Sequence, residues 1–150
     1  MDEVNYSELL TQVYADDINR LSKYIPYFEN KGGKDVATTY DGKLGESNLK
    51  FPVYDSTLLS FTNEASRTKF MDPNYMYKYR SAHIQTEKQE ADAIIYSKPK
   101  DIDLLRAILS RYVLEGRYKG IRWIEGTERR VFLNVLKRFR DMLHDVTAYE

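Results

Sequence analysis

Two amphipathic patterns near the C-terminus restrict the folds that this chain can adopt. Residues 101–115 carry an apolar stripe at helical spacing, formed by Leu105, Ile108, Leu109, Tyr112 and Val113. Residues 128–143 continue at steps of three and four, with Phe132, Val135, Leu136, Phe139 and Leu143. Such stripes are typical of helices that bury one face against a neighbour. We therefore predict two helices that pack on each other, antiparallel or crossing, and that supply much of the core.

The segment between these patterns, residues 116–132, holds glycines, arginines and Trp123, the only tryptophan of the chain. We interpret it mainly as a turn. Gly116 suits a left-handed backbone conformation just past the first helix. Gly126 would let the chain reverse before Thr127 caps the second helix. Trp123 is expected to cover the end of the core that the two helices share.

Two arginines of this segment are the candidates for a binding site. Arg117 and Arg122 carry charges that cannot be buried unpaired without a large free-energy cost. They therefore either reach solvent or pair with carboxylates such as Glu115 and Glu125. A small anionic ligand or an acidic partner, if the protein has one, is expected here. The predicted ligand- or partner-binding residues are Arg117, Tyr118, Arg122 and Trp123.

The N-terminal part of the chain is also predicted to be helical, and a short β-hairpin follows it. Residues 5–29 have helical spacing, which Pro26 is expected to distort or divide because proline lacks a backbone donor. The apolar residues that recur there at helical spacing are Leu9, Leu10, Val13, Tyr14, Ile18, Leu21, Ile25 and Phe28. In residues 36–54, β-branched and aromatic residues flank "DGKLGESN", which predicts a hairpin. Pro52 predicts that its strand is an edge strand.

Helical segments are predicted again between the hairpin and residue 101. Asp55 or Ser56 can cap a helix, and Asp72 with Pro73 predicts the start of another. The inward residues expected in the first are Leu58, Leu59, Thr62, Ala65 and Phe70. "TEKQEADAIIY" predicts a short acidic helix or turn. The fold class that follows is mainly α, a single small helical domain over residues 1–150 with one short β-hairpin.

The residue types exclude several kinds of catalytic and metal site. The chain has no cysteine, which excludes disulfides, thiol catalysis and cysteine-based zinc or iron–sulfur sites. His83 and His144 do not occur in a metal-binding spacing. Neither a nucleophile elbow nor a phosphate-binding loop is present. We predict no metal, no cofactor and no catalytic residues, and we favour a non-enzymatic interaction or regulatory module.

The ends of the chain and its apolar runs bear on location. The N-terminus, MDEVNYSELL, is acidic and does not resemble a signal peptide. No apolar run approaches the roughly 20 residues that a spanning helix needs. We predict a cytoplasmic protein without membrane contact. A protein partner, a small anionic ligand and a homo-oligomer are left open.

Basic residues are concentrated near the C-terminus of a chain whose net charge is zero. Residues 106–140 hold ten basic and three acidic residues, but extending the window to 101–145 adds four aspartates and lowers the net charge from +7 to +3. A nucleic-acid-binding protein that uses the basic 117–138 region is the second hypothesis. The excess of positive charge is small and aspartates flank it, so we rank the nucleic-acid hypothesis low. An enzyme whose site is built from dispersed carboxylates and arginines is the third.

The C-terminal patterns also resemble a known family. "LLRAILSRYVLEGRYKGIRW" followed by "VFLNVLKRF" is similar to the signature of a bacterial family catalogued as a domain of unknown function, DUF6508. "KYIPYFEN" and "PVYDSTLLSF" resemble its earlier segments, so the likeness extends over residues 18–143. Tyr118 stands where the family usually has phenylalanine. The resemblance implies a single helical domain and brings no activity with it.

Overall fold

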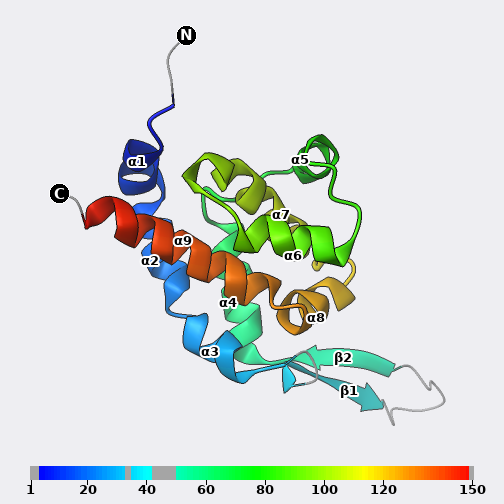
Figure 1. The fold of residues 1–150 in the computed structure, drawn as a ribbon. Helices are drawn as coiled ribbons and strands as arrows, with labels where there is room; N and C mark the ends of the chain where they lie inside the picture. The colour runs from blue at the N-terminus through cyan, green and yellow to red at the C-terminus, as the bar shows by residue number, and fades with distance from the viewer. Residues whose placement is uncertain (1–3, 33–34, 42–49, 149–150) are drawn as a thin grey trace.

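A computed structural model of the chain describes residues 4–32, 35–41 and 50–148. The fold is mainly helical, as predicted, and two antiparallel strands project from one end of the helices (Figure 1). The helices are α1 (Tyr6–Glu8), α2 (Ala15–Ser22), α3 (Ile25–Asn30), α4 (Ser56–Ser66), α5 (Tyr75–Ser81), α6 (Glu87–Ile95), α7 (Ile102–Glu115), α8 (Ile121–Glu128) and α9 (Val131–Thr147). A π-helix, η1 (Leu9–Tyr14), joins α1 to α2, and a 3₁₀-helix, η3 (Pro99–Asp101), precedes α7. The strands are β1 (Ala37–Asp41) and β2 (Lys50–Tyr54).

The core is centred on α7 and α9, whose apolar stripes face inward as predicted. Every predicted stripe residue is buried except Leu143, which is half-buried. The rings of Tyr112 on α7 and Phe132 on α9 meet edge to face at 6.2 Å. Helix α9 also packs on α2, α3, α6 and α8, and Figure 1 shows it lying across the front of the molecule. The buried side chains of these helices form one hydrophobic cluster.

The predicted helical structure of residues 5–29 is confirmed, but at its start the side chains that face the core differ from those of a regular α-helix. Residues 9–14 form a π-helix, which fits more residues into each turn than an α-helix and so shifts the face that meets the core. Leu10 and Tyr14 are therefore buried, whereas Val13, which belongs to the same apolar pattern, is exposed. Pro26 divides the segment as expected, because α2 ends at Ser22 and α3 carries the proline in its first turn.

The two strands are those of the predicted hairpin. β1 pairs with β2 in antiparallel register, and Thr39 lies opposite Pro52. Because the sheet has two strands, the strand that contains Pro52 is an edge strand, as predicted. The turn predicted at "DGKLGESN" lies mostly outside the described residues.

Helices α4 and α5 differ in detail from the predictions. Leu59 is exposed and Phe61 is buried on α4, because the buried positions 58, 61, 62 and 65 follow a helical face that excludes 59. Helix α5 begins at Tyr75, so Pro73 is not its first residue. Asp72 instead accepts a hydrogen bond from the backbone N–H of Asn74 at 2.9 Å and stabilises the turn before the helix. The predicted α6 is confirmed and carries a capping box between Thr86 and Gln89.

Residues 116–132 contain a helix, α8, that the sequence analysis did not predict. Gly126 and Thr127 lie inside α8, so neither the chain reversal nor the predicted cap occurs there. The Thr127 hydroxyl donates to the backbone carbonyl of Trp123, one turn earlier, at 3.0 Å. The chain turns later, at Arg130, whose φ of 62° places a non-glycine residue in the left-handed region just before α9.

The glycines of this segment serve side-chain packing. Gly116 has a φ of −63°, which any residue can adopt, so the predicted left-handed conformation is wrong. A Cβ atom at Gly116 would overlap the Trp123 ring, and one at Gly126 would overlap the Phe132 ring. Both positions are thus restricted by an aromatic ring that lies against the backbone.

Candidate functional site

Trp123, one of the four predicted site residues, is packed against the protein. Its indole N–H donates to the backbone carbonyl of Val113 on α7 at 3.1 Å. Its ring meets the Tyr54 ring edge to face at 5.3 Å and lies against Gly116. The side chain therefore fastens α8 to α7 at the edge of the core, which agrees with the structural role expected for it.

Arg122 is engaged in ion pairs. Its Nε donates to Glu115 Oε1 at 3.0 Å, and its Nη1 donates to Glu125 Oε2 at 2.9 Å. Burial acts to lower the pKa of Arg122, but the hydrogen bonds from its guanidinium to the two carboxylates raise the pKa above its ordinary value. Of the two environments considered for this arginine, pairing with Glu115 and Glu125 is the one that the structure adopts.

Arg117 and Tyr118 are the exposed members of the predicted set. Both lie in the turn between α7 and α8, and 72% of Tyr118 is exposed. Across the ranges that the structure describes, no carboxylate lies within ion-pairing distance of Arg117. Burial, the Glu115 carboxylate and the Tyr118 hydroxyl raise the pKa of the neighbouring Tyr75 above its ordinary value.

A ring of alternating charges extends from Arg122 through α6, α7 and α8. We call it the charged ring, and its members in order are Glu90, Arg111, Glu115, Arg122, Glu125 and Arg129. Arg129 follows α8 and its Nη2 contacts Glu125 Oε2 at 3.0 Å and Glu87 Oε1 at 2.9 Å. Its Nη1 donates to the Tyr112 hydroxyl at 3.2 Å, which closes the ring towards Glu90. The charged ring thus ties three helices together.

Glu90 is the most deeply buried member of the charged ring, with 4% of its surface exposed, and Glu115 is also buried. Its Oε1 accepts a hydrogen bond from the Tyr112 hydroxyl at 2.6 Å, and its Oε2 accepts one from the Tyr79 hydroxyl at 2.7 Å. Burial and the adjacent Glu90 carboxylate raise the pKa of both tyrosines above the ordinary value of 10.0. The two hydroxyls therefore stay protonated at neutral pH and act as donors to Glu90.

Arg111 is the member whose hydrogen bonds are incomplete. Its Nη1 lies 3.8 Å from Glu90 Oε2 and its Nε lies 3.7 Å from Glu115 Oε2, and both distances exceed that of a hydrogen bond. The Nε atom is buried and has no hydrogen-bond partner among the described residues. The guanidinium carbon lies 4.9 Å from the centre of the Tyr79 ring, over its face.

A polar pocket of about 250 Å³ opens beside the charged ring. It is lined by Ile84, Gln85, Thr86, Glu87, Glu90, Arg111, Arg122 and Arg129. Three guanidinium groups and two carboxylates contribute to its wall, so the wall carries one net positive charge. The pocket joins segments from the start of α6, from α7 and from α8, and Arg122 is the single predicted site residue that lines it.

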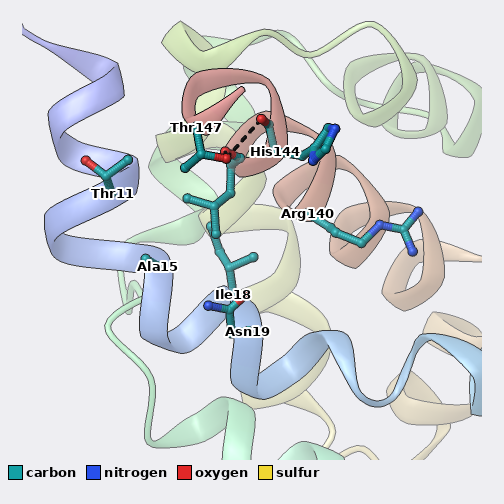
Figure 2. Close-up of a pocket in the computed structure, with 8 residues that line it drawn as sticks. Thr11, Ala15, Ile18, Asn19, Arg140, His144 and Thr147 are labelled. Atoms are coloured by element: carbon teal, nitrogen blue, oxygen red, sulfur yellow. Dashed lines mark hydrogen bonds between the residues drawn. The ribbon is translucent and has the colours of Figure 1, made fainter. Parts of the chain in front are cut away.

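A larger hollow of about 450 Å³ lies between the N-terminal helices and α9 (Figure 2). Its lining includes Thr11, Asn19, Arg140, His144 and Thr147. Figure 2 shows Arg140 and His144 extending away from Thr11 on the facing helix, so these two side chains do not converge on it across the hollow. The Thr147 hydroxyl donates within its own helix, to the carbonyls of Leu143 and His144. This hollow is therefore the weaker candidate.

The described ranges hold no cluster of three or more histidine, aspartate or glutamate side chains placed to bind a metal ion. Both His83 and His144 are exposed.

The charged ring was not predicted from the sequence. Its members come from three helices, and the Tyr112–Glu90 hydrogen bond joins residues 22 positions apart. Two signals were present. Pairing of Arg122 with Glu115 and Glu125 was one of the alternatives considered, and Arg111 and Glu115 are four residues apart on a predicted helix, which is the spacing of an intrahelical ion pair. Nothing in the spacing of Glu90 or Tyr79 indicates that they meet these residues.

Comparison of the chain with protein-family models, with curated proteins and with solved structures found no match.

Proposed function

We propose that this chain is a non-enzymatic interaction module whose partner binds at the turn between α7 and α8. The observation that carries the proposal is the exposure of Arg117 and Tyr118 on this turn. Tyrosine and arginine are enriched among the few residues that supply most of the binding free energy at protein interfaces. Here one of each is presented to solvent at adjacent positions.

The base of the turn is held in place, which favours binding. Arg122 fixes its C-terminal side through Glu115 and Glu125, and Trp123 bonds to the backbone of α7. Gly120 lies against the Tyr54 hydroxyl so closely that a Cβ atom would overlap it. A surface that is already ordered loses less conformational entropy when a partner binds. Arg122 and Trp123, which are packed, thus hold the turn that presents Arg117 and Tyr118.

The side chains around Tyr118 indicate what kind of partner would fit. Ile121 is exposed at the start of α8, and Lys119 is exposed beside Arg117. An aromatic and an aliphatic side chain would contact an apolar depression, and the two cations would meet carboxylates at its edge. We propose a partner protein with an acidic rim around an apolar contact.

Alanine substitutions in the turn should separate binding from stability. We expect Arg117→Ala and Tyr118→Ala to lose partners in a pull-down from a lysate of the source organism, with melting temperatures close to wild type. Arg122→Ala should lower the melting temperature, because Glu115 and Glu125 lose their shared partner.

Tyr96→Ala is the matched control, since Tyr96 is 75% exposed at the end of α6 and should bind partners as wild type does. Recovery of the same partners by Arg117→Ala and Tyr118→Ala would contradict the proposal. A large stability loss in Arg117→Ala would instead show that this arginine is structural.

The nucleic-acid hypothesis keeps a lower rank because much of the basic region is engaged within the chain. Arg122 and Arg129 belong to the charged ring, and Arg138 donates to the Ser97 hydroxyl and to its carbonyl. Phosphate binding depends on several cations that are free to release counterions. Arg117, Lys119 and Arg130 are exposed, but three cations make a small electrostatic contact.

We expect no sub-micromolar binding of DNA or RNA at physiological salt. Titration of labelled single- and double-stranded oligonucleotides, followed by fluorescence anisotropy, measures this directly. Tight binding that Arg117→Glu or Arg130→Glu weakens would reverse the ranking of the two hypotheses.

The enzyme hypothesis is supported by the polar pocket, where Glu90 and three arginines converge. Both oxygens of Glu90 accept hydrogen bonds from tyrosines, so a proton transfer at this carboxylate would first break one of them. We therefore rank an enzyme below an interaction module.

Other properties remain predictions. They are membership of the DUF6508 family and a cytoplasmic location, and assembly into a homo-oligomer stays open. Of the helices in the described ranges, none combines the length and the apolar character that crossing a membrane requires.

A further inference from the structure

We propose that the pocket beside the charged ring binds a small oxyanion, a carboxylate or phosphate group, through the guanidinium of Arg111. The site involves α6, α7 and α8 and shares neither Arg117 nor Tyr118 with the partner surface. It therefore goes beyond the proposed function, and either one can fail without the other.

The unmet hydrogen-bonding capacity of Arg111 carries this inference. A guanidinium has five N–H donors, yet the ion pairs of Arg111 with Glu90 and Glu115 are 3.8 and 3.7 Å long. Its Nε is buried without a partner in the described part of the chain, which costs free energy. Arg122 and Arg129, by contrast, make contacts of 2.9–3.0 Å to carboxylates. The Nε atom is enclosed by protein, so an oxyanion in the pocket would supply acceptors to the Nη groups of Arg111.

The orientation of Arg111 is fixed before any ligand binds. Its guanidinium lies over the Tyr79 ring at 4.9 Å, an arrangement in which the cation is attracted to the face of the ring. Tyr79 is itself buried and held by its hydrogen bond to Glu90. With one face covered, the donors on the edge of the guanidinium remain for a ligand. A planar fork of this kind matches carboxylate and phosphate oxygens.

The charge of the pocket wall favours an anion. Arg111, Arg122 and Arg129 line it together with the carboxylates of Glu87 and Glu90. Glu90 repels an incoming anion less than a bare carboxylate would, because two tyrosine hydroxyls donate to its oxygens. The Glu87 carboxylate forms an ion pair with Arg129, in which Oε1 lies 2.9 Å from Nη2. Arg111 is the cation in this wall that has no carboxylate at hydrogen-bond distance among the described residues.

The size of the pocket limits the ligand. Its volume of about 250 Å³ lies below the roughly 300–1,000 Å³ of pockets that hold drug-sized molecules. Inorganic phosphate or a short dicarboxylate fits such a volume, whereas a nucleotide would extend into solvent. The ligand class is therefore a small oxyanion or the terminal oxyanion group of a larger molecule.

Inorganic phosphate and malonate are the two probes that test this proposal, with ionic strength held constant by sodium chloride. We expect a saturable rise in the melting temperature of the wild-type chain with at least one of them, and isothermal titration then gives the dissociation constant. Arg111→Met keeps an aliphatic side chain on Tyr79 and removes the guanidinium. It should weaken binding by roughly tenfold to a hundredfold, the equivalent of one charged hydrogen-bonded contact.

Arg140→Met is the matched control, because Arg140 is an exposed arginine of α9 outside the charged ring, and it should bind as wild type does. A wild-type chain that responds to neither probe at millimolar concentrations would refute the proposal, as would equal binding by Arg111→Met. Should Arg111→Met not fold, the side-chain Nε–H signals of the wild-type arginines are followed by NMR during the phosphate titration. A selective shift of one signal, assigned to Arg111 by its loss in Arg111→Lys, supports the site, and no shift refutes it.

Discussion

Alanine at Leu109 or at Leu136 should lower the free energy of unfolding by about 2–5 kcal/mol, the range for buried leucines. Leu109 on α7 is fully buried and Leu136 on α9 is nearly so. Each substitution removes apolar contacts from the centre of the core and leaves a cavity there. Denaturation by guanidinium chloride, followed by circular dichroism and by the fluorescence of Trp123, measures the loss.

Leu59→Ala is the matched control for this pair. Leu59 lies on α4 and is exposed, so its truncation should change the free energy of unfolding by less than about 1 kcal/mol. If Leu109→Ala or Leu136→Ala left the unfolding transition at its wild-type position, α7 and α9 could not be the centre of the core.

The sequence was most informative where apolar residues recur over several turns. Helices α7 and α9 have 14 and 17 residues, and their stripes are long enough to determine both helix type and inward face. The same spacing does not predict burial at residues 9–14. They form a π-helix, which has a different number of residues per turn, and Val13 is therefore exposed. Periodicity thus predicts burial only where the backbone keeps the period that was assumed.

Helix α8 was missed because glycine has two different structural uses. We read Gly116 and Gly126 as residues that permit special backbone angles, and hence a turn. In the structure each glycine leaves room for an aromatic ring, that of Trp123 or that of Phe132. Within residues 116–132, the left-handed conformation is adopted by Arg130, a residue that backbone propensity would not select for it. Which ring meets which glycine depends on tertiary packing, so one sequence could not decide between the two uses.

The four predicted site residues show the same limit. The sequence indicated that Arg122 would pair with Glu115 and Glu125 or reach solvent, and the structure adopts the first. It gave no sign that these pairs continue through Arg129 and Arg111 to Glu90. The charged ring arises from the way in which α6 packs on α7 and α9, which no local pattern specifies. Apart from Arg122, which was predicted to bind a small anion, and the spacing of Arg111 and Glu115, the residues of the proposed oxyanion site were therefore beyond sequence reasoning.

Removing the Glu90 side chain should destabilise the protein by about 2–5 kcal/mol. Glu90→Ala leaves the buried hydroxyls of Tyr79 and Tyr112 without their acceptor, and each unsatisfied buried group costs roughly 1–3 kcal/mol. Arg111 also loses one of its two carboxylate neighbours. Glu90→Gln should cost less, because the amide keeps the shape of the side chain and one carbonyl acceptor for a tyrosine. The free energies of unfolding of both variants are measured by guanidinium denaturation.

Glu87→Ala separates the effect of a buried acceptor from that of an acidic residue on α6. Glu87 lies one turn before Glu90 and also pairs with an arginine, but its side chain is largely exposed. An exposed ion pair is worth at most about 1 kcal/mol, so this variant should remain close to wild type. If Glu90→Ala were as stable as Glu87→Ala, the tyrosine–glutamate bonds would not hold α5, α6 and α7 together. The fixed orientation of Arg111 would then lose its support, because Tyr79, on which the guanidinium lies, is held by Glu90.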